Sequence, residues 1–132
     1  MNKEFIPYKQ AIALKKLGFD EPCFGCYDEK TIFGLTVMSI KQYYTNSKED
    51  TWNCAAPLYQ QAFRWFREKH NLDSSIALVA DGYGFYIHKN RNYTNKGENY
   101  GMHITYEEAE LACLDKLIEL TFKTKINCKT TR

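Results

Sequence analysis

Two cysteines with CxxC spacing are the residues in this sequence whose chemistry is easiest to recognise. Cys23 and Cys26 could form a redox pair or supply half of a zinc site. A zinc site needs further ligands, and the remaining Cys and His residues follow no second CxxC or HxxxH spacing. A redox pair should open a helix, whereas this pair lies in a strand-like segment that follows a helix. We therefore predict two buried structural thiols, and we expect no metal and no cofactor.

The segment Gly82-Tyr83-Gly84-Phe85 partly matches the aromatic signature of RNA-recognition motifs, in which rings on a strand stack on bases. It departs from that signature at Asp81, which stands where a phosphate-binding Lys or Arg is expected. Tyr83 and Phe85 also fit one buried strand face. Binding of single-stranded nucleic acid through Tyr83 and Phe85 is therefore an alternative hypothesis and not the leading one.

Basic and aromatic side chains supply the main candidates for a binding surface. They lie on the polar side of a predicted helix and in or beside an Asn-rich loop: Arg64, Arg67, Arg91, Tyr93 and Tyr100. Such residues can follow a phosphate backbone or meet a protein surface, and interfaces concentrate binding energy in Tyr, Trp and Arg. A solvated helix face and a solvated loop are the alternative explanation. We take these residues as tentative contacts for a protein partner.

The common signatures of catalysis are missing from the sequence, which has no GxSxG elbow, phosphate loop, HExxH or dinucleotide glycine pattern. The formal charge of +2 is too balanced to predict a nucleic acid or an anionic membrane as partner. No apolar run is long enough for a signal peptide or a bilayer span. The 5 cysteines, an odd number, favour reduced thiols. We expect a non-enzymatic cytosolic protein that does not bind membranes.

The hydrophobic pattern predicts the elements that must position these candidates. Helices with one apolar face are expected at 7–17, 58–71 and 106–120. Hairpins are expected within 23–40 and 75–88, the second turning at Asp81-Gly82, and a short strand at 100–104. Residues 43–52 are polar and are expected to form a solvated loop. The predicted fold is α+β, with three helices packed on one antiparallel sheet of four or five strands.

Domain organisation follows from length and charge. At 132 residues, 44% hydrophobic and 26% charged, the sequence predicts a single domain over residues 1–120. Residues 121–132 carry Lys and Arg without any acid and are expected to be a mobile basic tail. The core should include Phe63, Phe66, Leu114 and Leu117, with Trp65 partly exposed at its margin.

Each predicted helix begins with Tyr, two polar residues and Ala, at Tyr8, Tyr59 and Tyr106. One interpretation is a duplication, with two helix-hairpin units closed by a C-terminal helix. The alternative is that Tyr and Ala are convenient packing residues for a first helical turn.

Several longer segments resemble a group of small proteins of Bacteroidota and their tailed phages to which no activity is assigned. The resemblance is carried by Phe5-Ile6-Pro7-Tyr8, by residues 17–25 and 61–69, and by Thr105-Tyr106-Glu107-Glu108-Ala109-Glu110-Leu111-Ala112. It implies a phage or mobile-element setting and no catalytic residue, and the group typically has Tyr in place of Cys26. We therefore expect an accessory protein that binds a protein of the host or phage. Nucleic-acid binding and a cysteine-based metal or redox protein are the alternatives.

Overall fold

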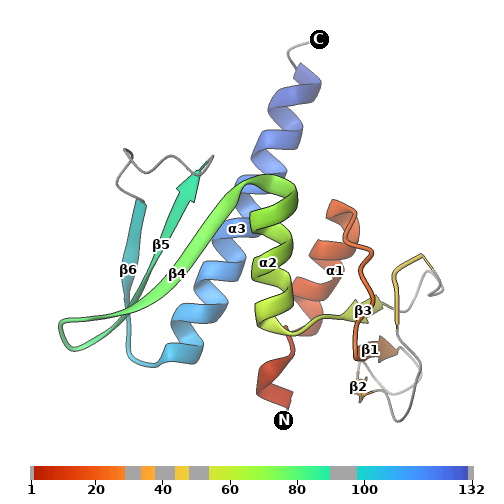
Figure 1. The fold of residues 1–132 in the computed structure, drawn as a ribbon, viewed down its shortest axis with the longest axis horizontal. Coiled ribbons are helices and arrows are strands. Elements are labelled where there is room, and N and C mark those ends of the chain that lie inside the picture. Colours follow the sequence, from red (N-terminus) through yellow and green to blue (C-terminus); the bar gives the residue numbers. More distant parts are fainter. Residues whose placement is uncertain (1, 29–33, 38–43, 48–53, 90–97, 131–132) are drawn as a thin grey trace. The chain divides into compact units, whose positions relative to one another are not determined.

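The computed structural model describes residues 2–28, 34–37, 44–47, 54–89 and 98–130 (Figure 1). Within these ranges three α-helices and two three-stranded antiparallel sheets form an α+β fold. The predicted class is confirmed, but the predicted single sheet of four or five strands is wrong. The chain forms two compact units, residues 1–62 and 63–132. The predicted single domain over residues 1–120 stays a prediction.

Helix α1 (Tyr8–Leu17) follows a short 3₁₀ turn at Asn2–Glu4 in the first unit. Pro7 precedes it with φ −65°, which suits a helix start, and Gly18 ends it in the left-handed region with φ 99°. The Gly18 N–H donates to the Lys15 carbonyl at 3.1 Å, so a terminal carbonyl that would lack a helical partner is satisfied. The helix therefore begins and ends within one residue of the predicted bounds.

The first sheet contains β1 (Gly25–Asp28), β2 (Gly34–Val37) and β3 (Cys54–Ala56) in the order β2-β1-β3. The pairing of β1 with β2 confirms the predicted hairpin. Strand β3 is too short and too poor in β-branched residues for its sequence to predict a strand. A Cβ on Gly25 would lie 2.8 Å from Cε1 of Phe5, so this strand position needs glycine because a ring covers it.

Asn46 lies in the segment that was expected to be a solvated loop. Its Nδ2 donates to the Phe19 carbonyl at 2.6 Å, and its Oδ1 accepts from the Ala55 N–H at 2.9 Å. Tyr44 and Cys23 exchange two backbone hydrogen bonds of 2.8 and 2.9 Å. A side-chain amide both donates and accepts, so one Asn ties two backbone segments together. The described residues 44–47 thus include a turn, as expected of a loop, but this turn is tied to the neighbouring backbone and is only partly solvated.

Helix α2 (Tyr59–His70) is followed almost directly by β4 (Leu72–Val79). Asn71 makes this possible, because its φ of 55° ends the helix in the left-handed region. Phe63 and Phe66 are buried as predicted. Trp65, expected to be partly exposed, is only 4% exposed, so that prediction is wrong. Its ring meets the Phe66 ring edge to face, with centroids 5.0 Å apart.

The second sheet is a meander of β4, β5 (Gly82–Lys89) and β6 (Glu98–His103) in the order β4-β5-β6. The predicted hairpin is confirmed, but its turn is Ala80-Asp81 and not Asp81-Gly82. Ala80 takes the positive φ of 43°, while Gly82 already pairs with Val79. A Cβ on Gly82 would collide with the His103 carbonyl oxygen of β6. Glycine is needed here for the close approach of a neighbouring strand.

Helix α3 (Tyr106–Thr130) packs on one face of the second sheet and contacts all of its strands. Leu114 and Leu117 are completely buried, which confirms the predicted core positions. The first turn is capped by the predicted pair, Thr105 and Glu108, with the return bond of Glu108 on Ile104, one residue before the N-cap. The Glu108 N–H donates to Thr105 Oγ1 at 3.1 Å, and the Ile104 N–H donates to Glu108 Oε2 at 3.2 Å.

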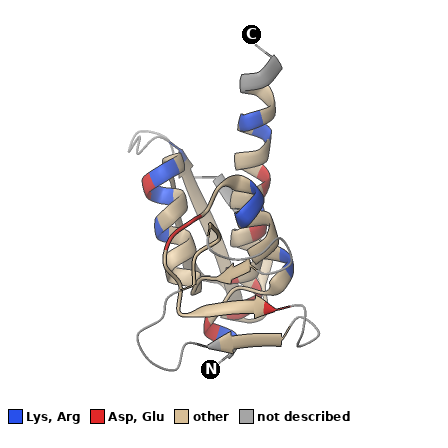
Figure 2. Ribbon diagram, turned by 90° about the vertical axis from the view of Figure 1, so that its right-hand side faces the viewer, with Lys and Arg blue, Asp and Glu red and all other residues tan. Residues whose placement is uncertain are grey.

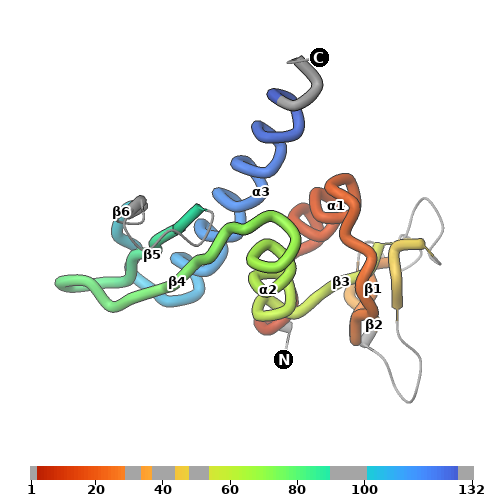
Figure 3. The backbone as a smooth tube through the Cα atoms, turned by 45° about the horizontal axis from the view of Figure 1, so that its top comes forward, coloured from red at the N-terminus to blue at the C-terminus, as the bar shows by residue number. Residues whose placement is uncertain are grey.

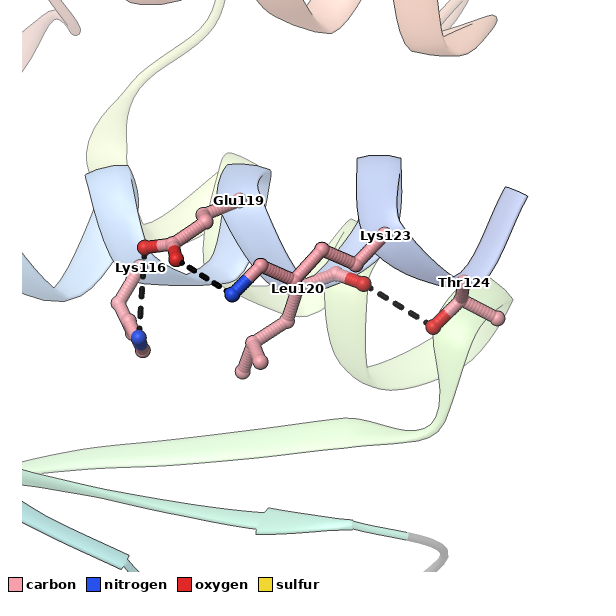
Figure 4. A network of polar contacts seen from close by, with 5 residues as sticks. All are labelled: Lys116, Glu119, Leu120, Lys123 and Thr124. Atoms are coloured by element: carbon pink, nitrogen blue, oxygen red, sulfur yellow. Dashed lines mark hydrogen bonds and ion pairs between the residues drawn. The ribbon is translucent and has the colours of Figure 1, made fainter. Parts of the chain in front are cut away.

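Residues 121–130, expected to belong to a mobile basic tail, are instead the last turns of α3, which run past the end of the sheet (Figures 1 and 3). No Gly or Pro occurs within the helix to end it. Glu119 pairs with Lys123 at 2.9 Å, and the Thr124 hydroxyl donates to the Leu120 carbonyl at 3.0 Å (Figure 4). The ion pair between Glu119 and Lys123, one turn apart, supports a helix that leaves the sheet.

The proposed duplication is not reflected in the topology of the two sheets. In each unit a helix is followed by three strands, but β1, the first strand, is central in one sheet and β5, the second strand, in the other. Tyr8 meets Tyr27 edge to face with centroids 5.5 Å apart. Tyr106 meets Tyr83 in the same way at 5.7 Å. Two of the repeated tyrosines thus have a shared packing role, as the alternative explanation requires.

Candidate functional site

The cysteine pair lies at and beside the start of β1, where both side chains are buried. The Cys23 thiol donates to the Glu21 carbonyl at 3.3 Å. Burial, and after it the charge of Glu21, raises the pKa of Cys23 to about 12. A nucleophilic thiol needs the opposite shift, toward a thiolate at neutral pH. In the part of the chain that the structure describes, no three His, Cys, Asp or Glu side chains gather as a metal site would require.

Only two of the tentative contact residues, Arg64 and Arg67, have side chains that the structure describes, so the predicted binding surface stays a prediction. Arg64 and Arg67 lie exposed on α2. Arg91 and Tyr93 lie outside the described residues. The backbone of Tyr100 belongs to β6 and pairs with Phe85, while its side chain is outside what the structure describes.

The two rings proposed to stack on bases face α3 and not an open sheet surface. Phe85 is 3% exposed and its ring stacks on His103, with centroids 6.2 Å apart. Tyr83 is half-buried against Tyr106 at the start of α3. A buried ring offers no face to a base. Because side chains alternate along a strand, Tyr86 and His88 are the rings that β5 presents on the opposite face.

Large apolar side chains instead gather in the open around one end of the second sheet. We call them the sheet-end patch; it contains the exposed side chains of Leu78, Met102, Ile104 and Tyr106, together with the half-buried Tyr83 that pairs with Leu78 and contacts Tyr106. Leu78 is 72% exposed, Met102 63% and Ile104 84%, so these side chains lie mostly in water. Single exposed apolar residues are common, but a contiguous group of them usually marks a binding surface.

Strand pairing and a ring contact join three members of the sheet-end patch, Leu78, Tyr83 and Tyr106. Leu78 and Tyr83 are opposite each other on β4 and β5, and Tyr83 contacts Tyr106. A Cβ on Gly82 would lie 3.2 Å from Cγ of Met102, which places the Met102 side chain on the face of β5 opposite Tyr83, because side chains alternate along a strand. Ile104 lies in the short link from β6 to α3. The sheet-end patch is therefore set on regular elements and not on a long loop.

Ile104 gives the clearest sign that this surface is not simply an extension of the core. It precedes the N-cap Thr105, a position where an apolar side chain usually packs back on the helix as a hydrophobic staple. The staple partner would be Ala109, which is fully buried, yet Ile104 is 84% exposed. The Ile104 side chain therefore does not make the usual staple contact with the helix and stays exposed to water.

Acidic side chains surround the sheet-end patch. Asp81 lies in the β4–β5 turn, and Glu107 and Glu108 lie in the first turn of α3. All three are exposed. Acids are favoured in the first turn of a helix by its partial positive charge, which explains the two glutamates. Asp81 has no such explanation, because it belongs to a hairpin turn.

The sequence analysis missed this surface because it assigned apolar residues to the core by periodicity. One signal was available, since Met102 and Ile104 lie outside the predicted apolar helix face, in the short strand expected at 100–104. Their exposure depends on where α3 crosses the sheet, which periodicity does not specify.

A scan against protein-family models and searches of curated proteins and of solved structures found no match to this chain. Among the helices in the described ranges, none is long and apolar enough to cross a membrane.

Proposed function

We propose that this chain is a non-enzymatic protein that binds another protein through the sheet-end patch. The observation that carries the proposal is the exposure of Leu78, Met102, Ile104 and Tyr106 at one end of the second sheet. Burying apolar surface releases roughly 25 cal/mol per Å², so covering these side chains would favour association. Tyrosine is also enriched among the residues that contribute most to binding.

The surrounding charge indicates the chemistry of the partner. Asp81, Glu107 and Glu108 place negative charge beside the apolar side chains. Such a surface repels phosphates and attracts a partner that carries Lys or Arg around an apolar centre. A protein with an apolar and basic surface, such as one side of an amphipathic helix, fits both features.

The proposed biological context of this function rests on the resemblance of several sequence segments to proteins of Bacteroidota and their tailed phages. The proposed partner is a host or phage protein in the host cytosol. This part of the proposal rests on sequence segments alone and is independent of the sheet-end patch.

Affinity capture from a bacterial host lysate would test the patch with matched variants. The patch variant carries Leu78→Ser and Ile104→Ser, both at highly exposed positions. A second variant carries Arg64→Ser and Arg67→Ser, and a Lys16→Gln protein controls for surface substitution as such. We expect a partner that the parent, the arginine variant and Lys16→Gln retain and that the patch variant loses. Loss in the arginine variant with retention in the patch variant would contradict the proposal.

Self-association is tested separately by sedimentation of the purified protein over a range of concentrations. We expect a monomer, because joining two copies patch to patch would bring acidic residues together. A dimer that the patch variant abolishes would replace the foreign partner with a second copy of this chain and overturn the proposal.

The two alternatives also have direct tests. Salt-dependent binding of a generic single-stranded oligonucleotide that Arg64→Ser and Arg67→Ser weaken would favour nucleic acid. Stoichiometric zinc in the purified protein would favour a cysteine-based site.

A further inference from the structure

A pocket of about 390 Å³ opens in the second unit at the opposite end of the sheet from the sheet-end patch. Its wall is made where four elements meet: the end of α2 at His70, the start of β4 at Leu72, the end of β5 at Lys89, and the last turns of α3. Leu72 and Lys89 are register partners, which fixes one side of the pocket. The other side is formed by α3, where it runs past the sheet.

The imidazole of His70 is held in one orientation by two aromatic rings. Trp65 meets it edge to face with centroids 4.7 Å apart, and Phe66 lies 6.0 Å away. Its Nε2 is buried and has no hydrogen-bond partner among the described residues. An unsatisfied buried polar atom costs about 1–3 kcal/mol in the folded state.

Positive charge dominates the pocket wall. Lys89 and Lys123 line the pocket. Burial is the main cause that lowers the pKa of His70, and the positive charge of Lys125 nearby is the second. Glu119 is an acid on the same helix, and its carboxylate forms ion pairs with Lys123 at 2.9 Å and with Lys116 at 3.3 Å (Figure 4). One carboxylate between two ammonium groups leaves positive charge in excess. Figure 2 shows the Lys and Arg positions on the last turns of α3.

The lysines of α3 have an ordinary explanation, because cations are favoured near a helix C-terminus. Lys89 does not, since it ends a strand, and strands have little net dipole. The apolar part of the wall, Leu72 and Leu120, is also more than a free inorganic ion would need. The volume lies at the lower end of the range for small-molecule sites.

We propose that this pocket binds a small organic anion whose phosphate or carboxylate group meets Lys89 and Lys123 and whose apolar part lies against Leu72 and Leu120. The ammonium groups supply the charge, since lysine binds phosphate and carboxylate as a point charge. The Thr121 and Thr124 hydroxyls donate to the Leu117 and Leu120 carbonyls and are therefore not available as donors to the ligand. The site is distinct from the sheet-end patch, and either proposal can fail without the other.

Calorimetric titration of the full chain with four probes would test the site. Phenyl phosphate and benzoate carry both required features, inorganic phosphate carries only the charge, and phenol carries only the ring. We expect phenyl phosphate or benzoate to bind more tightly than inorganic phosphate and phenol, and the better of the two identifies the anionic group. Lys89→Gln should weaken that binding about tenfold, as expected for the loss of one charged contact. Lys16→Gln, at an exposed lysine of the first unit, should not change it.

The same titration followed by NMR gives a second readout that does not depend on folding of a variant. A bound anion should raise the pKa of His70, because it stabilises the imidazolium. Absence of phenyl phosphate and benzoate binding at millimolar concentration would overturn the proposal. Binding that Lys89→Gln leaves unchanged, or that leaves the His70 titration unmoved, would overturn it as well.

Discussion

The ring of Tyr83 meets the ring of Tyr106 edge to face, with centroids 5.7 Å apart and an interplanar angle of 84°. Tyr83 lies near the start of β5, and Tyr106 is the first residue of α3. The contact therefore fixes the beginning of the helix at the end of the sheet where the exposed apolar residues gather. It couples the position of the sheet-end patch to the stability of the second unit.

Removing this ring contact should cost a measurable part of the stability. We expect Tyr106→Ala to lower the free energy of unfolding. The lost ring contact should contribute about 0.5–1.5 kcal/mol, in addition to the effect of the apolar surface that is no longer buried. Tyr106→Phe keeps the ring and should stay close to the parent. Urea denaturation followed by circular dichroism measures both variants. Equal losses for Phe and Ala would show that the hydroxyl, and not the ring, holds the helix start.

The β4–β5 turn offers a matched pair of substitutions with opposite expected signs. Ala80 has a φ of 43°, which glycine adopts with less strain. We therefore expect Ala80→Gly to be neutral or stabilising by up to about 1 kcal/mol. Gly82→Ala should destabilise by about 1–3 kcal/mol, because its Cβ meets the His103 carbonyl. Thermal melts of the two proteins decide the question, and destabilisation by Ala80→Gly would contradict the observed turn.

The buried face of α2 should respond differently from its exposed face. Phe66 is fully buried, so Phe66→Ala should cost about 3–5 kcal/mol of unfolding free energy. Arg67, the next residue, is exposed, and Arg67→Ala should stay within about 0.5 kcal/mol of the parent. Chemical denaturation of both variants tests the assignment of the helix face. Similar stabilities for the two variants would contradict it.

Local patterns predicted the elements that depend on nearby residues. The burial of Phe66 and Leu117 follows from helical periodicity, and the capping box at Thr105 and Glu108 follows from two side chains three positions apart. Gly18 ends α1 for the same kind of reason. These features need no knowledge of the rest of the chain.

Features that depend on distant residues were predicted poorly. The pairing of Tyr27 with Cys54 joins strands far apart in the sequence, so the partition into two sheets could not be read from hairpin signals. Gly82 was assigned to a turn because its role as a contact for β6 depends on His103. The sheet-end patch and the pocket beside Lys89 depend on where α3 crosses the sheet, and the sequence pattern gives only its apolar face.

Two buried thiols should be unreactive in the folded protein. Burial is the main reason why the pKa of Cys23 and the pKa of Cys113 are both raised to about 12. The reactive thiolate form is therefore scarce at neutral pH. We expect iodoacetamide to modify both slowly in the native state and rapidly in denaturant. Peptide mass spectrometry after a timed reaction measures each cysteine. Fast native labelling of Cys23 would contradict its burial and revive the redox interpretation.

Acid should weaken the folded state through His70. Burial first, and then the charge of Lys125, lowers the pKa of His70 below its usual 6.5. The unfolded chain therefore binds a proton at a higher pH than the native state does. The stability from neutral His70 is present above about pH 6.5 and is lost as the pH falls through the window below it. Lys89 and Lys123 share the pocket wall with His70.

Two measurements check this prediction. In an NMR titration the His70 ring resonance, assigned by its disappearance in His70→Gln, should have a midpoint below that of an unstructured histidine. Urea denaturation at several pH values should show the parent losing stability as the pH falls through the same window, while His70→Gln loses less. A normal or raised midpoint would contradict the burial of Nε2 beside the lysines, because an accessible or anion-paired imidazole would protonate at least as easily as in the unfolded chain. A midpoint that is normal in phosphate buffer and lowered in its absence would instead identify an anion already bound in the pocket.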